Sequence, residues 1–115
     1  MRIYAKGGIS MWREMGEKAL RQLIDESPTS VPVYFYTPTC GNCKLARRIL
    51  DAVLHTHPDI TVVSCNLNLM PRLAIEWQIE RNPALLMVKQ NGVVKRRYDF
   101  LPGNDLAKWL SDATD

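Results

Sequence analysis

The chain has 115 residues, a formal net charge of +3 and a hydrophobic fraction of 46%, values that are typical of one globular domain with a single core. No apolar run approaches the ~20 residues that a membrane helix requires, and the basic residues form no broad stripe of the kind that binds nucleic acid. We therefore expect a single domain over residues 1–115, with neither a membrane nor a nucleic acid as its partner.

The first residues and the cysteine count predict where the protein acts. The start of the chain contains no continuous apolar h-region, so we expect no signal peptide and a cytoplasmic location. Three cysteines are too few for a disulfide scaffold and are odd in number. In a reducing compartment, a Cys-x-x-Cys pair is more often catalytic or metal-binding than structural.

The N-terminal part predicts a helix followed by a buried strand. Ser10 has a capping side chain, and apolar residues after it recur at helical spacing through Glu26. A small strand at Ile3–Ala5 is a further expectation. The run VPVYFYT, over residues 31–37, is β-branched and aromatic with little alternation, which indicates a strand buried on both faces.

The middle of the chain predicts a long helix and a second buried strand. The helix extends from about Gly41 to Thr56, with an apolar stripe along one side. Arg47 and Arg48 lie on the other side and are interpreted as part of a solvated face. The strand is the run ITVVSCNL, in which we expect Cys65 to behave as a small buried hydrophobe.

The last third of the chain predicts a short helix, a hairpin and a closing helix. Pro71 suits the first turn of a helix that continues through Trp77 and Gln78. The runs ALLMVK and VVKRRY flank QNG, whose Asn-Gly pair is a strong hairpin signal. The segment LPGNDLAKWLSDA predicts a helix capped by Asn104 or Gly103.

This order of elements predicts an α/β fold. The first two strong strands are joined through a helix, so they should be parallel with a right-handed crossover. The last two strands should form an antiparallel hairpin. We therefore expect a mixed central sheet with helices on both faces, which is a three-layer α/β/α sandwich.

The stretch PTCGNCK, residues 38–44, lies where the first strong strand meets the long helix. Active sites collect at the carboxyl edge of open α/β sheets. Cys40 would stand at the start of the helix, where unpaired N–H groups and the helix dipole lower the pKa of a thiol from ~8.5 to ~3.5–7.5. Cys43 would lie nearby and deeper, so we expect Cys40 to attack a disulfide and Cys43 to resolve the mixed disulfide.

A zinc site and an inert structural pair are the alternatives to a redox couple. Cys40, Cys43, His55 and His57 have the composition of a two-Cys, two-His metal set. However, Cys43 and His55 are twelve residues apart on one helix, which is roughly 18 Å and too far for one metal ion. We expect no metal site, interpret the histidines as helix-end residues, and favour redox chemistry with the inert pair still open.

Several of these features together resemble the thioredoxin family over nearly the whole chain: VYFYTPTCGNCK, Pro83 forty residues after Cys43, LLMVKQNG and the closing helix. The resemblance implies the thioredoxin fold and thiol–disulfide exchange with protein disulfide substrates. It also implies a thioredoxin-reductase-like reductant and no bound cofactor beyond the redox-active Cys40–Cys43 disulfide. By this resemblance Cys40 is the nucleophile, Cys43 is the resolving thiol and Pro83 is a cis-proline beside them.

The resemblance also implies substrate-binding and modulating residues. Asn82 and Ala84 flank the proline, where family members hydrogen-bond an extended substrate segment, and Thr39 occupies the docking position before Cys40. The residues expected to modulate reactivity are Gly41, Asn42, Lys44 and Tyr34.

The sequence departs from the family pattern at several of these positions. Thr39 stands where Trp is usual, and Asn42 stands where Pro is usual. Tyr34 occupies the place of a buried Asp that helps the resolving thiol to lose its proton, and Ser64 or a neighbour replaces the Lys that partners this Asp. Phe100 is expected to narrow a groove that a Gly usually lines.

These departures leave two main functional classes to separate, and a metal or iron–sulfur carrier that bridges two chains through the Cys pair is a third possibility. The leading hypothesis is a monomeric thiol–disulfide oxidoreductase in which water or another group, with Glu80 as a candidate, receives the Cys43 proton. The alternative is a redox-inactive or specialised protein-binding module on a thioredoxin scaffold.

Overall fold

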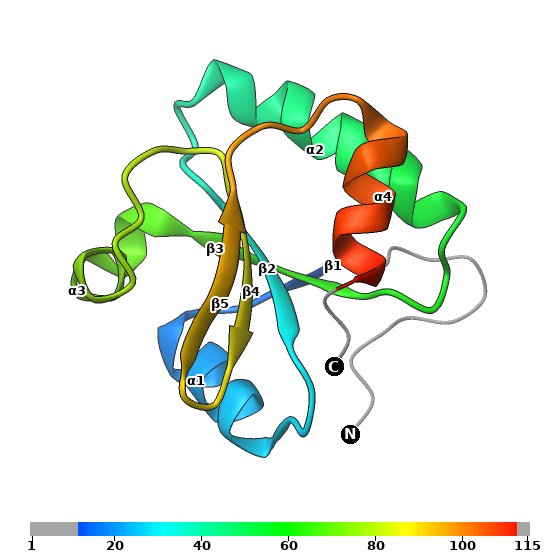
Figure 1. Ribbon diagram of the computed structural model, residues 1–115. Helices are drawn as coiled ribbons and strands as arrows, with labels where there is room; N and C mark the ends of the chain where they lie inside the picture. The colour runs from blue at the N-terminus through cyan, green and yellow to red at the C-terminus, as the bar shows by residue number, and fades with distance from the viewer. Residues whose placement is uncertain (1–11, 113–115) are drawn as a thin grey trace.

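The computed structural model describes residues 12–112 as a five-stranded sheet covered by helices on both faces (Figure 1). The strand order is β1-β3-β2-β4-β5; β1, β3 and β2 are parallel, β4 is antiparallel to β2, and β5 is antiparallel to β4. This arrangement confirms the predicted mixed sheet and three-layer α/β/α sandwich. The elements are β1 (Trp12–Glu14), α1 (Glu17–Glu26), β2 (Val31–Tyr36), α2 (Gly41–His55), β3 (Val62–Asn66), the 3-10 turn η1 (Leu67–Leu69), α3 (Pro71–Glu76), β4 (Ala84–Lys89), β5 (Gly92–Arg97) and α4 (Gly103–Ser111).

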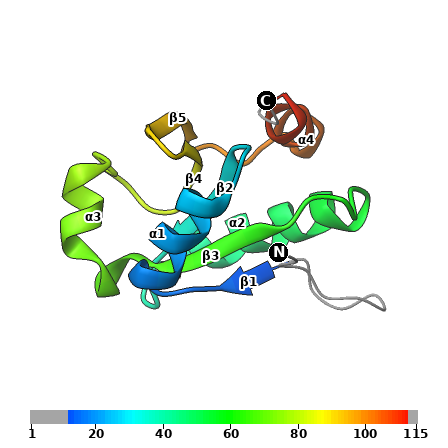
Figure 2. The same cartoon turned by 90° about the horizontal axis from the view of Figure 1, so that it is seen from below.

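Alternation along β2 divides the core into two layers. Val33 and Phe35 face α1 and α3, whereas Tyr34 faces α2 and α4. Both faces are buried, as the apolar run of β2 predicts. Figure 2 shows the sheet with β1 at one edge and β5 at the other, so β2 is the central strand.

The segments that the sequence predicts to be functional meet at one end of the central strands, where β2 and β3 have their carboxyl ends. The carboxyl ends of β2 and β3 lie side by side, with Tyr36 opposite Asn66. The amino end of β4 joins them, because Ala84 pairs with Phe35. The loop that leads into α2 and the loop that leads into β4 therefore meet at this edge.

The predicted helix from Ser10 to Glu26 is wrong in its first part. Trp12–Glu14 is a strand that pairs with β3, and the helix begins only at Glu17, after Gly16 at the N-cap. A free edge of β3 offers main-chain hydrogen bonds that outweigh the weak helical spacing before Gly16. Ser10 and the expected strand at Ile3–Ala5 lie outside the described residues.

The other element predictions hold, with small changes at the ends. Helix α2 ends at His55 with Thr56 as its C-cap, and α3 begins at Pro71 but ends at Glu76. The hairpin is confirmed, and Gly92 follows its two-residue turn with a φ of 131°, a value that favours glycine. Helix α4 begins at Gly103 and has Pro102 at its N-cap, so the predicted cap at Asn104 or Gly103 is wrong.

The helices of residues 12–112 are all too short or too polar to cross a membrane.

Candidate active site

Cys40 and Cys43 form a disulfide at the junction of β2 and α2, with their Cα atoms 5.3 Å apart. Cys40 is the N-cap residue of α2, and its Sγ accepts a hydrogen bond of 3.1 Å from the backbone N–H of Cys43. Cys40 is partly exposed, whereas Cys43 is only 4% exposed. The two sulfurs therefore differ in access, and the main-chain N–H that caps the helix would favour a thiolate on Cys40.

The loop before β4 lies against this disulfide. The Asn82–Pro83 peptide bond is cis, as the family resemblance implied. The Asn82 carbonyl oxygen lies 3.9 Å from the Cys40 Sγ, and the Asn82 side-chain amide donates a 3.1 Å hydrogen bond to the Thr37 hydroxyl. The structure thus brings Cys40, Asn82 and Pro83 together and ties the two loops to each other.

The remaining predicted residues surround the disulfide at different depths. Thr39, Gly41, Asn42 and Lys44 are exposed. A Cβ at Gly41 would meet no atom within 4 Å, so this position opens onto free space. Ala84 is fully buried and is paired with Phe35 of β2.

Tyr34 occupies the place of the expected buried carboxylate, beneath the first turn of α2. Its hydroxyl donates a 2.6 Å hydrogen bond to the Cys43 carbonyl oxygen, and its side chain is 1% exposed. Burial raises the pKa of Tyr34 to about 12, against a smaller opposing effect of the Arg47 charge. The phenol therefore remains neutral near pH 7, fixes the helix start and does not supply the missing base.

A polar and aromatic cluster beside Tyr34 was missed by the sequence reasoning. The Arg47 guanidinium stacks 4.0 Å from the Trp12 ring centroid and donates a hydrogen bond to the buried Ser64 hydroxyl. The Trp12 indole N–H in turn donates to Asp51, so Arg47 is held in place rather than solvated. The available signal was its spacing, since Arg47 is one helical turn after Cys43 and Ser64 is paired with Tyr34 in the predicted parallel strands.

Because Tyr34 replaces the expected buried carboxylate, the positions of two other carboxylates, those of Glu80 and Glu14, are of interest. Glu80 is exposed, and its backbone N–H bonds to the Tyr98 hydroxyl, so no described contact links it to Cys43. Glu14, by contrast, accepts a 2.7 Å hydrogen bond from the Tyr36 hydroxyl at the edge that carries the disulfide. Sequence reasoning placed this residue in a helix and so did not consider it.

Two hollows flank the first turns of α2. The proline-side groove, about 470 Å³, is lined on its helix side by Asn42, Leu45 and Ile49 and on its loop side by Pro83, Phe100 and Leu101. Phe100 is 6% exposed and packs edge-on to Tyr34, so the expected bulky side chain is present in the groove. The cationic hollow, about 480 Å³, is lined by Tyr34, Tyr36, Thr37, Pro38, Cys40, Cys43, Lys44, Arg47 and Arg48.

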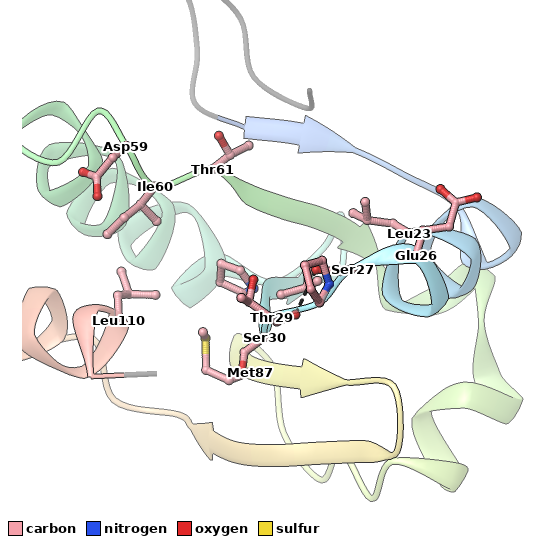
Figure 3. A pocket seen from close by; sticks show the side chains of 13 residues that line it. Leu23, Glu26, Ser27, Thr29, Ser30, Asp59, Ile60, Thr61, Met87 and Leu110 are labelled. Carbon is pink, nitrogen blue, oxygen red and sulfur yellow. Dashed lines mark hydrogen bonds between the residues drawn. The ribbon is translucent and has the colours of Figure 1, made fainter. Parts of the chain in front are cut away.

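A third hollow lies at the opposite edge of the sheet (Figure 3). It is lined by residues that precede β2 and β3, such as Ser30 and Ile60, and by Leu110 of α4. The Ser30 hydroxyl is buried there without a hydrogen-bond partner among residues 12–112. The lining of this hollow includes no cysteine or histidine.

The third cysteine lies apart from the other two. Cys65 is fully buried in β3 on the side of the sheet that faces α1 and α3, which confirms its predicted core position. Burial raises the pKa of the Cys65 thiol to about 12, and the charge of Glu14 adds to this effect.

The histidines lie far along α2 from the disulfide. His55 and His57 are within hydrogen-bond distance of the main-chain carbonyls of Asp51 and Val53 at the C-terminal end of the helix. Among residues 12–112, no group of three or more His, Cys, Asp or Glu side chains is placed to hold a metal ion.

The chain is similar in sequence to known proteins. The thioredoxin family model matches residues 12–112. Thioredoxin-like protein YusE of Bacillus subtilis is 40% identical over 68 residues, which are 59% of this chain and 64% of YusE. Chloroplastic thioredoxin Y2 of Arabidopsis thaliana is 34% identical over 92 residues, which are 79% of this chain and 55% of that protein. The chain thus spans somewhat more than half the length of these two relatives.

A solved structure extends the similarity to the fold. Thioredoxin NaTrxh from Nicotiana alata superposes with a TM-score of 0.75 and 17% identity, covering 96% of this chain and 99% of that protein. A Cys-x-x-Cys pair at disulfide distance within a family-model match of this extent supports thiol–disulfide oxidoreductase chemistry. With the family model matched from β1 to the end of α4, the chain belongs to the thioredoxin family.

Proposed function

We propose that the protein is a thiol–disulfide oxidoreductase that exchanges disulfides with protein substrates through Cys40 as nucleophile and Cys43 as resolving thiol. One observation carries the proposal: the two sulfurs of the disulfide differ in exposure and in hydrogen bonding. Cys40 is partly exposed at the N-cap of α2 and accepts the Cys43 N–H, whereas Cys43 is almost fully buried. Only the first sulfur is open to a partner, and it is also the one on which negative charge is stabilised.

The reaction follows from this asymmetry. In the reduced protein, the Cys40 thiolate attacks one sulfur of a substrate disulfide; a Cys40–substrate disulfide forms and the other substrate sulfur leaves as a thiolate, which takes a proton from water. The Cys43 thiolate then attacks the Cys40 sulfur. The Cys40–Cys43 disulfide forms again, the second substrate thiolate leaves, and two electrons have passed to the substrate.

The proline-side loop is the proposed dock for the substrate main chain. The Asn82 carbonyl lies 3.9 Å from the Cys40 Sγ, so a chain lying beside Pro83 would bring its own sulfur next to Cys40. The main-chain groups of Asn82 and Ala84, together with Thr39, are the proposed contacts. Gly41 leaves room for the approach, since a side chain there would occupy free space above the helix.

The cycle requires a source of electrons, which we propose is a thioredoxin-reductase-like dithiol enzyme acting without a cofactor bound to this chain. We propose that the protein thereby takes part in electron transport to cellular disulfides and in redox homeostasis. We further propose that it works as a monomer in the cytoplasm. The unpaired, buried Cys65 supports a reducing compartment, where a third thiol needs no partner.

A trapping experiment tests the proposed roles. Cys43→Ser removes the resolving thiol, so substrate proteins should accumulate as mixed disulfides on Cys40, visible as bands that disappear on reduction. Cys40→Ser is the matched control and should trap nothing, and the wild-type protein should reduce insulin disulfides. No trapped species together with no insulin reduction would refute the function, and trapping on Cys43 in the control would reverse the roles.

The binding-module alternative keeps one observation in its favour, since Tyr34 is a neutral phenol where a proton acceptor for Cys43 is expected. Under this alternative, the double variant Cys40→Ser, Cys43→Ser would bind the partner as tightly as the wild type. Under the proposed oxidoreductase function, partner capture depends on Cys40 and is lost in the double variant.

A further inference from the structure

We propose that the cationic hollow selects protein disulfides whose reacting cysteine is flanked by Asp or Glu. The inference rests on the oxidoreductase function proposed above and names its substrate class. It commits to one occupant, an acidic side chain of a polypeptide substrate. The hollow lies beside the disulfide, because Cys40 and Cys43 are part of its lining.

The lining of the hollow has three positive charges and no carboxylate. Lys44, Arg47 and Arg48 contribute the charges, and the other lining residues are aromatic, small or uncharged. Arg47 is fixed by its stacking on Trp12 and its bond to Ser64, so its charge is already in place before a substrate arrives. Preorganised charge reduces the entropy lost on binding.

Lys44 and Arg48 are the two charges free to meet a substrate. Both are exposed, and neither has an ion pair or hydrogen bond from its side chain to another residue in the 12–112 region. They are separated by one helical turn on the side of α2 that also carries Cys40. Like charges at this spacing repel each other, and a bound carboxylate would relieve the repulsion.

The N-terminal turn of α2 lacks the negative charge that helix ends favour. Its first turn contains no acidic residue and includes Lys44, which opposes the helix dipole. Two carboxylates contact groups beside the hollow: Glu14 of β1 accepts the Tyr36 hydroxyl, and Asp51 of α2 accepts the indole N–H of Trp12, the ring on which Arg47 stacks. Neither carboxylate lines the hollow, so a substrate carboxylate would meet only positive charge among the charged residues of its lining.

The geometry of an extended substrate brings such a side chain within reach. Successive residues of an extended chain are about 3.3 Å apart. When the substrate sulfur is at Cys40, residues one or two positions from the substrate cysteine lie within about 7 Å of it along the chain. The opposite flank does not provide the same preference, because the proline-side groove contains both Arg81 and Asp99.

The test uses the full reduced chain and three synthetic disulfide peptides that differ only beside the reacting cysteine, with Asp, Asn or Lys. Second-order rate constants are measured at low and high salt. We expect the rate to fall in the order Asp, Asn, Lys, with about a tenfold span at low salt that shrinks at high salt. The double variant Lys44→Glu, Arg48→Glu should reverse the order.

The matched control is Lys89→Glu, Lys108→Glu, which makes the same change in net charge away from the hollow and should keep the wild-type order. Melting curves and the reduction of the Asn peptide show that each variant is folded and active. Equal rates for the three peptides, or an unchanged order in Lys44→Glu, Arg48→Glu, would overturn the charge selection alone. No reduction of any peptide by the wild type would overturn the oxidoreductase function, and this inference with it.

Discussion

The two flanks of α2 at the disulfide are built from different chemistry. Toward the loop before β4, the helix presents Leu45 and Ile49, and Leu101 across the groove is 64% exposed. Toward β2 it presents Lys44 and Arg48 instead. The i, i+3, i+4 geometry of a helix sorts neighbouring residues onto these two sides, so a few positions of one short segment produce two distinct surfaces.

The difference indicates that the apolar flank and the cationic flank have separate roles in binding a substrate at the disulfide. The apolar flank lies next to main-chain groups that an extended segment of any sequence could use. The cationic flank distinguishes partners by the charge of their side chains, which differs from one partner to another. Tyr34 lies beneath both, packing against Phe100 on one side and Trp12 on the other. General binding and partner choice would thus be separable by mutation.

The largest predicted effect is the difference in reactivity between the thiols of Cys40 and Cys65. At pH 8, a pKa of about 12 leaves only on the order of 10⁻⁴ of Cys65 as thiolate. In the reduced native protein, iodoacetamide should therefore label Cys40 and should label Cys65 more than 1,000-fold more slowly, as counted by mass spectrometry of peptides. In guanidinium chloride all three cysteines should react. Fast native labelling of Cys65 would show that the chemistry is not confined to the junction between the flanks.

The next largest effect is a loss of stability when a residue of the apolar flank is truncated. Phe100→Ala removes a 6% exposed ring that packs against Tyr34, so we expect a loss of about 3 kcal/mol in the free energy of unfolding by urea. Leu101→Ala is the matched control, because Leu101 is exposed, and should cost no more than about 0.5 kcal/mol. Equal costs for the two variants would show that Phe100 does not anchor this flank to the core.

A smaller loss of stability is predicted for a change at Tyr34, which lies beneath both flanks. Tyr34→Phe removes the hydrogen bond to the Cys43 carbonyl and should cost about 1 kcal/mol of stability. Tyr36→Phe is the control; its hydroxyl bonds to the exposed Glu14, so its loss should cost less. The reduction potential of the pair should shift in Tyr34→Phe and not in Tyr36→Phe, and the reverse would contradict the role given to Tyr34.

The Tyr34 phenol also makes the stability of the folded protein decrease at alkaline pH. Tyr34 has a pKa of about 12 in the folded protein against an ordinary value of 10, so between these pH values the unfolded chain has lost a proton that the native state retains. The stabilisation is complete below pH 10 and is lost as the pH rises through 12. Urea midpoints measured from pH 9 to 11.5 should fall less steeply in Tyr34→Phe than in the wild type, and parallel curves would contradict this.

Much of the fold was predictable because its signals are local. The apolar run of β2, the cap and stripe of α2 and the Asn-Gly hairpin each depend on a few neighbouring residues. Strand β1 was not predictable in the same way, since Trp12–Glu14 is a strand only because β3 lies beside it. The disulfide and the proline loop came from motif and resemblance.

The surroundings of the disulfide were less accessible to sequence reasoning. Arg47 beside Arg48 has the pattern of a solvated helix face, yet it stacks on Trp12, whose position depends on β1. The bond from Tyr34 to the Cys43 carbonyl likewise requires the depth of α2 over β2, which no spacing encodes. Side-chain contacts between elements distant in sequence were the part that only the structure supplied.

The proposed function requires that the sulfurs of Cys40 and Cys43, between the two flanks, form one reversible redox couple. Its most direct test is to equilibrate the native protein with dithiothreitol or glutathione buffers of graded potential, and to count free thiols by acid quenching and alkylation. We predict a single two-electron transition in which Cys40 and Cys43 change together while Cys65 stays reduced throughout. A pair that remains disulfide-bonded in excess dithiothreitol, or remains reduced in the most oxidising buffer, would show that the two cysteines are not a reversible redox couple.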